Sequence, residues 1–128
     1  FKLKDKIKIS RWIDTSIKKE KFHTGIINII FCSDSYLLKI NKTFLKRDYF
    51  TDIITFNYCE KKIISGDIFI SIDRVKKNAK KYKNTFQKEL NRIIIHGILH
   101  LIGYDDMTES KKKIMTKKES LYLDIFTY

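Results

Sequence analysis

Proline is absent from this chain of 128 residues, and glycine (four), cysteine (two) and alanine (one) are rare. Because no stretch is rich in proline, glycine or serine, there is no candidate linker, and we expect residues 1–128 to form one domain. No apolar run is long enough to cross a bilayer, and the first residues mix charges with apolar positions, unlike a signal peptide. Cys32 and Cys59 lie in apolar stretches without metal-type spacing, so we expect them to be packing residues in a reduced, cytoplasmic compartment.

Acidic residues are also scarce, because 15 Asp and Glu stand against 27 Lys and Arg, for a formal net charge of +12. Such an excess favours polyanionic partners, nucleic acid first and an acidic membrane surface second. Lysine and isoleucine dominate the composition, however, as they also do under genome-wide compositional bias. The charge therefore supports contact with RNA or DNA but does not establish it.

Hydrophobic periodicity predicts four strands and about five helices. The expected strands cover residues 3–9, 26–32, 52–58 and 66–72, with a loop or hairpin turn over 60–65. The expected helices cover residues 10–22, 34–44, 73–82, 86–102 and 108–126. The predicted fold class is α+β: a small mixed four-stranded sheet flanked by about five helices. The most apolar helix carries two histidines, as the metal helix of zincin-like enzymes does.

The most informative segment is HGILHLIGYDD, residues 96–106, in which two histidines lie four positions apart in an apolar run. On a helix these positions share one face, so His96 and His100 can direct both imidazoles at one point. Gly103 is suited to end the helix, because glycine adopts left-handed conformations at little cost. The chain can then fold back and bring Asp105 or Asp106 to the same point. Two imidazoles and a carboxylate with an open fourth position form a catalytic-type metal site.

Gly97 occupies the position at which the zinc peptidase motif HExxH has its catalytic glutamate. The general base of that class of enzymes is therefore missing from this helix, which argues against a peptidase. A glycine at this position has two explanations from the sequence alone. It leaves room above the metal for a bulky substrate, or it permits close packing of the helix against its neighbours.

Residues 96–105 follow the pattern H-G-x-L-H-L-x-G-Y-D and resemble the YbeY family of rRNA maturation endoribonucleases. The similarity continues in TDIITF, residues 51–56, and in GDI, residues 66–68, which match the family's T-D-V-L-S-F and G-D-I segments. Met115 and Glu119 fall at the spacing that the family shows after its last metal ligand. The resemblance thus spans most of the chain.

Two departures from the family pattern concern the site. Asp106 stands at the position of the third ligand, usually a histidine; since a carboxylate is an acceptable zinc ligand, we expect His96, His100 and Asp106 to hold the metal. Leu45 stands where the family usually has an arginine. Arg47, two residues on, is the candidate to stabilise charge on a phosphate in the transition state, and a solvated surface charge is the alternative.

The resemblance implies a single-strand-specific, zinc-dependent endoribonuclease with one zinc ion per chain. Its expected role is maturation of the 16S 3′ end and ribosome quality control, with rRNA and the small ribosomal subunit as partners and no membrane or DNA binding. In that site Asp105 either orients a histidine ligand through its second ring nitrogen or caps the closing helix. Basic residues of the helix over 73–82 either track the RNA backbone or form a solvated face. They are Arg74, Lys76, Lys77, Lys80 and Lys81.

Two other classes of function stay open at this level. One is a ribosome assembly factor without catalysis, in which zinc is purely structural; such sites are normally closed by four protein ligands. The other is a metal-dependent hydrolase whose substrate is not RNA. A basic, solvent-open groove at the metal favours the nuclease, a closed site favours the structural factor, and a small apolar pocket favours a small-molecule hydrolase.

Overall fold

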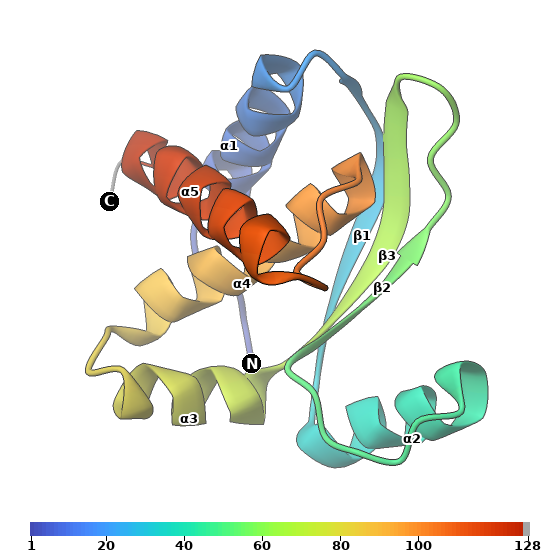
Figure 1. Ribbon diagram of the computed structural model, residues 1–128. Helices are drawn as coiled ribbons and strands as arrows, with labels where there is room; N and C mark the ends of the chain where they lie inside the picture. The colour runs from blue at the N-terminus through green and yellow to red at the C-terminus, as the bar shows by residue number, and fades with distance from the viewer. Residues whose placement is uncertain (127–128) are drawn as a thin grey trace.

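A computed structural model describes residues 1–126 as a three-stranded mixed sheet with helices on both faces (Figure 1). The elements in chain order are α1 (Lys6–Lys19), β1 (His23–Cys32), α2 (Asp34–Leu45), β2 (Ile53–Asn57), β3 (Ile63–Ser71), α3 (Ile72–Lys81), α4 (Phe86–Ile102) and α5 (Glu109–Ile125). The predicted α+β class, the mixed sheet and the helices are confirmed, although the sheet of the described residues has three strands, not four. Residues 127 and 128 of the predicted domain lie outside the described residues.

The predicted first strand over residues 3–9 is wrong, because helix α1 begins within that segment. Ile7, which alternates with Ile9 in the sequence, is 70% exposed, whereas Ile9 is buried. The buried apolar side chains of α1 lie at i, i+3, i+4 and i+8, a helical stripe: Ile9, Trp12, Ile13 and Ile17. The apparent alternation was thus the beginning of a helical period, sampled over too few residues to be distinguished from a strand.

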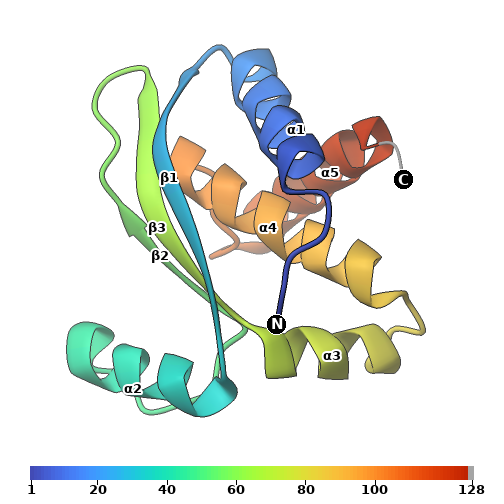
Figure 2. The same cartoon turned by 180° about the vertical axis from the view of Figure 1, so that it is seen from behind.

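Strand β3 is the centre of the sheet, parallel to β1 and antiparallel to β2. Alternate side chains of a strand face opposite sides, so β3 contributes to two cores. Ile64 and Ile68 lie in the main core with α1, α4 and α5, whereas Phe69 joins Leu37 and Ile40 of α2 in a smaller cluster. Figures 1 and 2, seen from opposite sides, both show α4 running between α1 and α5, while α2 lies apart at the end of the sheet.

Helix α4 has the predicted bounds, Phe86–Ile102. The hydroxyl of Thr85 accepts a hydrogen bond from a backbone N–H in the first turn, and Gly103 ends the helix with a φ of 124°. That φ lies where side chains with a Cβ are strained, so glycine is required. Although α4 is the most apolar helix, none of the helices in residues 1–126 combines the length and apolarity that crossing a membrane needs.

Gly97 lies where α4 packs most closely on the sheet. A Cβ atom built there would lie 2.8 Å from Cδ1 of Ile53 in β2 and 3.1 Å from Cγ2 of Ile68 in β3. Both distances are shorter than ordinary van der Waals contacts between carbon atoms. Close packing of the helix on the strands therefore explains this glycine, and room above a metal does not.

Candidate metal centre

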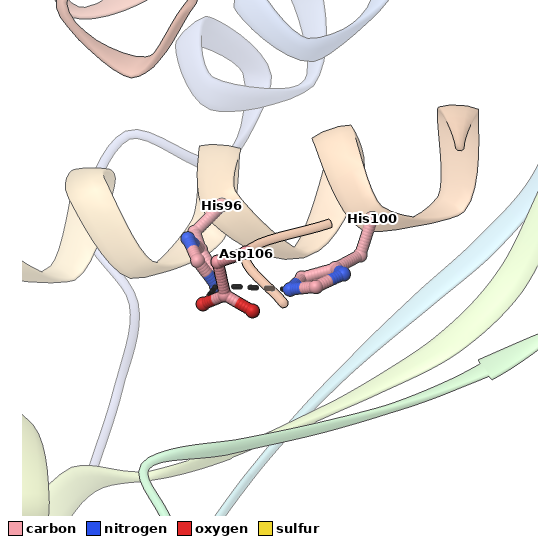
Figure 3. Close-up of side chains that lie close together, drawn as sticks. All are labelled: His96, His100 and Asp106. Carbon is pink, nitrogen blue, oxygen red and sulfur yellow. Dashed lines mark hydrogen bonds and ion pairs between the residues drawn. The ribbon is translucent and has the colours of Figure 1, made fainter. Parts of the chain in front are cut away.

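The two histidines of α4 and the carboxylate of Asp106 meet at one point (Figure 3). Nε2 of His96 lies 3.0 Å from Nε2 of His100 and 3.8 Å from Oδ2 of Asp106. One donor atom from each residue lies within 4.8 Å of the other two. Two ligand atoms bound to tetrahedral zinc at about 2.0–2.1 Å are about 3.3 Å apart, so the three donors fit a divalent cation with small movements.

The turn after α4 brings Asp106 back to the histidines. The N–H of Gly103 donates to the carbonyl groups of Leu99 and His100, each at 3.1 Å, and the N–H of Tyr104 donates to Leu99 at 3.0 Å. These bonds close the helix end with the reversal that a C-terminal glycine permits. Burial, followed by the nearby His96 ring, lowers the pKa of His100, which favours the neutral imidazole that metal binding requires.

Glu119 is the site residue whose role the sequence did not reveal. Its Oε2 lies 2.6 Å from Nδ1 of His96, and the side chain is buried in α5. When Nδ1 donates to this carboxylate, Nε2 carries the lone pair and presents it to Asp106 and His100. The signal in the sequence was its spacing after the last expected metal ligand, which matched the family but assigned no role.

Arg92 links Glu119 to a second buried carboxylate. Its Nη1 lies 3.6 Å from Glu119 Oε1, and its Nη2 lies 2.6 Å from Glu89 Oε2. The hydrogen bond to Glu89 raises the pKa of Arg92, so the guanidinium remains charged. This cation compensates the negative charge that Glu119 brings into the interface between α4 and α5.

Asp105 fills neither of its two predicted roles, because Thr108 caps α5 and the hydrogen bonds of Asp105 in the described structure do not reach the histidines. Its Oδ1 accepts a hydrogen bond from the N–H of Met107 at 3.0 Å, and its Oδ2 lies 3.3 Å from Nζ of Lys111. The Met107 N–H, followed by the Lys111 ammonium, lowers the pKa of Asp105. Asp105 therefore stabilises the turn that leads into α5, while Glu119 has the orienting position that was predicted for Asp105.

His96, His100 and Asp106, the candidate metal ligands, are called the metal triad below. Two open grooves border this triad, and His96 and Asp106 line both of them. The α2 groove, of about 430 Å³, is walled by the triad and by Asn41, Leu45, Arg47, Tyr49 and Asp52. The α5 groove, of about 730 Å³, is walled by Arg92, Lys112, Lys113, Lys117 and Glu119. The metal centre thus lies at the junction of two surfaces that carry basic side chains.

The sequence pattern described as Endoribonuclease YbeY matches residues 2–127. The chain belongs to the YbeY family. It is 49% identical over 123 residues to the Endoribonuclease YbeY of Karelsulcia muelleri, covering 96% of this chain and 87% of that protein. It is also 49% identical over 126 residues to the Endoribonuclease YbeY of Cytophaga hutchinsonii, covering 98% and 88%.

A solved structure shows the same fold. The solution structure of TM1509 from Thermotoga maritima matches with a TM-score of 0.68 and 32% sequence identity. The match covers 96% of this chain and 83% of that protein. Together with the relatives, it confirms the YbeY resemblance and the α+β class that were inferred from the sequence.

The two departures from the YbeY pattern, Leu45 and Asp106, line the same groove. Leu45 and Arg47 both line the α2 groove, together with His100 and Asp106. Arg47 therefore borders the same space as the residue that replaces the family's usual arginine. This placement brings a guanidinium to the groove that leads to the metal triad.

The basic residues predicted on α3 lie elsewhere, since none of the five lines either groove. Nη2 of Arg74 lies 3.1 Å from Oδ2 of Asp34, so this arginine is engaged in the junction of α2 and α3. The lysines beside the triad come from α5 instead, namely Lys112, Lys113 and Lys117. Periodicity predicted the helix over 108–126, but only the docking of α5 against α4 places these lysines at the site.

Proposed function

We propose that this chain is a zinc-dependent endoribonuclease that cleaves single-stranded RNA through His96, His100 and Asp106. Membership of the YbeY family supplies the class of reaction. The observation that carries the finer proposal is the convergence of two imidazole nitrogens and one carboxylate at the junction of two open grooves. Three protein ligands leave a coordination position for a reactant, as in catalytic zinc sites.

The donor set suits zinc, because two imidazole nitrogens and a carboxylate oxygen are among its common protein ligands. A cation bound there would supply Lewis-acid chemistry for phosphodiester cleavage. The side chains of this chain hold the donors in place: Glu119 fixes the ring of His96, and Gly103 allows the turn that returns Asp106. Rigid support of this kind keeps metal ligands within the tolerance that catalysis requires.

Arg47 and the lysines of the α5 groove are the proposed contacts for the phosphates of the substrate. A guanidinium near the reacting phosphate stabilises its developing charge. Lys112 and Lys113 line the groove on the other side of His96, where they can neutralise phosphates of the RNA backbone. The expected substrate is rRNA, in maturation of the 16S 3′ end and in quality control, with the small ribosomal subunit as the partner.

The accessible site supports catalysis over a purely structural zinc. The side chain of Asp106 is 42% exposed, and both grooves that it lines open to solvent. A structural zinc site is normally enclosed by four protein ligands. Basic walls also disfavour a small apolar substrate, which an enclosed hydrophobic pocket would suit better.

Metal analysis combined with an RNA cleavage assay tests the proposal. The purified protein is expected to hold one zinc ion per chain and to cleave a labelled single-stranded RNA. A chelator abolishes the cleavage, and added zinc restores it. His100→Ala loses both metal and cleavage, whereas the matched control His23→Ala, at an exposed position in β1, retains both. Chelator-resistant cleavage would overturn the metal mechanism, and zinc-loaded protein without RNA cleavage would overturn the nuclease.

A further inference from the structure

The segment between α2 and β2 places an exposed aromatic ring in the α2 groove. Tyr49 is 53% exposed and lines this groove together with His96, His100 and Asp106. A large aromatic side chain normally contributes most of its area to a core or an interface. An exposed ring in a groove that reaches a metal triad therefore points to contact with a ligand.

A buried amide holds this segment in shape. Asn41 is 1% exposed, and its Nδ2 donates a hydrogen bond to the carbonyl of Tyr49 at 2.9 Å. The carbonyl of Asn41 accepts from the N–H of Arg47 at 3.1 Å. Because one buried residue binds the backbone on both sides of Asp48, Tyr49 and Arg47 are positioned by the α2 scaffold.

Arg47 supplies the positive charge of the α2 groove, which the carboxylates of Asp52 and Asp106 also line. Nη1 of Arg47 donates to Oη of Tyr49 at 3.4 Å, which places a guanidinium next to the aromatic ring. The carboxylate of Asp48 is paired with Nζ of Lys42 at 3.2 Å, so its negative charge is offset. The neighbouring Phe50 is 52% exposed, but it does not line this groove, and its ring centre lies 5.6 Å from the Arg74 guanidinium.

We infer that Tyr49 and Arg47 form a nucleotide subsite beside the metal triad, in which an unpaired RNA base stacks on Tyr49 and Arg47 contacts a neighbouring phosphate. This inference rests on the proposed function. The groove volume of about 430 Å³ lies within the range of roughly 300–1,000 Å³ that is typical of small-ligand sites. Stacking on an aromatic ring needs a base that is free of its duplex neighbours and tolerates any base identity. The subsite therefore favours single strands without selecting a sequence.

Fluorescence anisotropy measures the affinity of zinc-loaded protein for a labelled single-stranded RNA. The RNA carries 2′-O-methyl groups so that it resists cleavage during the measurement. Tyr49→Ala is expected to weaken binding by about 5- to 150-fold, the range for loss of one stacked base. Tyr49→Phe retains the ring and should bind far better than Tyr49→Ala, losing only the hydroxyl that accepts a hydrogen bond from Arg47. The matched control Tyr58→Ala, at a position that is 58% exposed and outside both grooves, leaves binding unchanged.

Abasic nucleotides separate stacking from a general loss of structure. In a series of RNAs that each lack one base, the wild-type protein is expected to bind more weakly to the RNA that lacks the base stacked on Tyr49. Tyr49→Ala is expected to bind that abasic RNA and the intact RNA equally. Wild-type affinity in Tyr49→Ala, or an equal loss at every abasic position, overturns the subsite. Cleavage of unmodified RNA is measured in parallel. If the wild type cleaves and Tyr49→Ala binds normally, only the subsite fails, whereas a wild type that neither binds nor cleaves RNA overturns the proposed function as well.

Discussion

The carboxylate of Glu119 lies 2.6 Å from Nδ1 of His96 across the interface of α5 and α4, so the packing of two helices determines which nitrogen faces His100 and Asp106. A histidine ring has two nitrogens, and the partner of one decides the tautomer of the other. The same carboxylate lies 3.6 Å from Arg92. The geometry of the candidate metal ligands and the docking of α5 on α4 are therefore coupled through one buried side chain.

Glu119→Ala is expected to lower zinc affinity by about 10- to 100-fold, the usual effect of removing the partner of a ligating histidine. The loss follows because His96 is no longer held in the correct tautomer and orientation. Competition with a chromophoric chelator measures the affinity. Glu109→Ala, at an exposed position in the first turn of α5, is the control and should bind zinc as the wild type does. Unchanged affinity in Glu119→Ala would contradict the orienting role.

Asp106→Ala is expected to lose bound zinc, whereas Asp106→His should retain it. The alanine removes one of three donors, while the histidine restores the ligand that the family usually has. Zinc content per chain after gel filtration measures both variants. Asp105→Ala is the neighbouring control and should keep its metal, because its carboxylate contacts Met107 and Lys111 instead. Full zinc content in Asp106→Ala would remove this residue from the ligand set.

Gly97→Val is expected to reduce the free energy of unfolding by about 1–3 kcal/mol, as overpacking of a core does. The added atoms would meet Ile53 and Ile68, where even a Cβ lies closer than a normal contact. Urea denaturation followed by circular dichroism measures the loss. Lys76→Val on the exposed face of α3 is the control for placing valine in a helix. It should change the free energy of unfolding by only about a few tenths of a kcal/mol. A Gly97→Val variant as stable as the control would show that the space beside α4 is open.

The buried contacts of Glu20 make the free energy of unfolding depend on pH. Its carboxylate accepts hydrogen bonds from the hydroxyls of Tyr104, at 2.5 Å, and of Tyr122, and from Nζ of Lys118 at 2.9 Å. Burial alone would raise the pKa of Glu20, but these three donors outweigh it and lower the pKa below its ordinary value of 4.5. The unfolded chain therefore binds this proton more readily than the folded protein does.

The contribution of Glu20 to stability is complete above pH 4.5 and is lost as the pH falls through the lower folded value. Glu20→Gln should therefore be less stable than the wild type at neutral pH and should lose less stability on acidification. Denaturant midpoints across the acidic range measure both effects. Glu109→Gln, on the exposed surface, should retain the wild-type pH dependence. Parallel curves for Glu20→Gln and the wild type would refute this assignment.

We expect the lysines of α5, but not those of α3, to contribute to the salt dependence of RNA binding. Each phosphate contact that is lost reduces the slope of log affinity against log salt by about one. The double variant of Lys112→Ala and Lys113→Ala, in the α5 groove, should therefore have a shallower slope by up to about two. The matched double variant of Lys80→Ala and Lys81→Ala on α3 should leave the slope unchanged. The reverse result would return the RNA path to α3, one of the two alternatives that the sequence left open for its basic residues.

The sequence by itself determined the features that depend on neighbours along the chain. The bounds of α4, the shared face of His96 and His100, and the helix end at Gly103 all follow from the period of 3.6 residues and from the backbone freedom of glycine. The family pattern around these residues also indicated Asp106 as the third donor. Residues 3–9 were wrongly predicted as a strand, because a few residues do not distinguish a strand from a helix, and β3 begins at Ile63, within the predicted loop over 60–65.

Only the tertiary structure decided which distant side chains join the metal centre. Glu119 lies 23 positions from His96, and its role depends on the angle at which α5 packs on α4. Packing against Ile53 and Ile68 explained Gly97, and helix docking placed the α5 lysines, and not those of α3, beside the triad. These relationships arise from contacts between elements that are far apart in the chain. Local periodicity contains no information on such docking, so the buried partner of His96 and the lysines beside the two histidines emerged only from the folded chain.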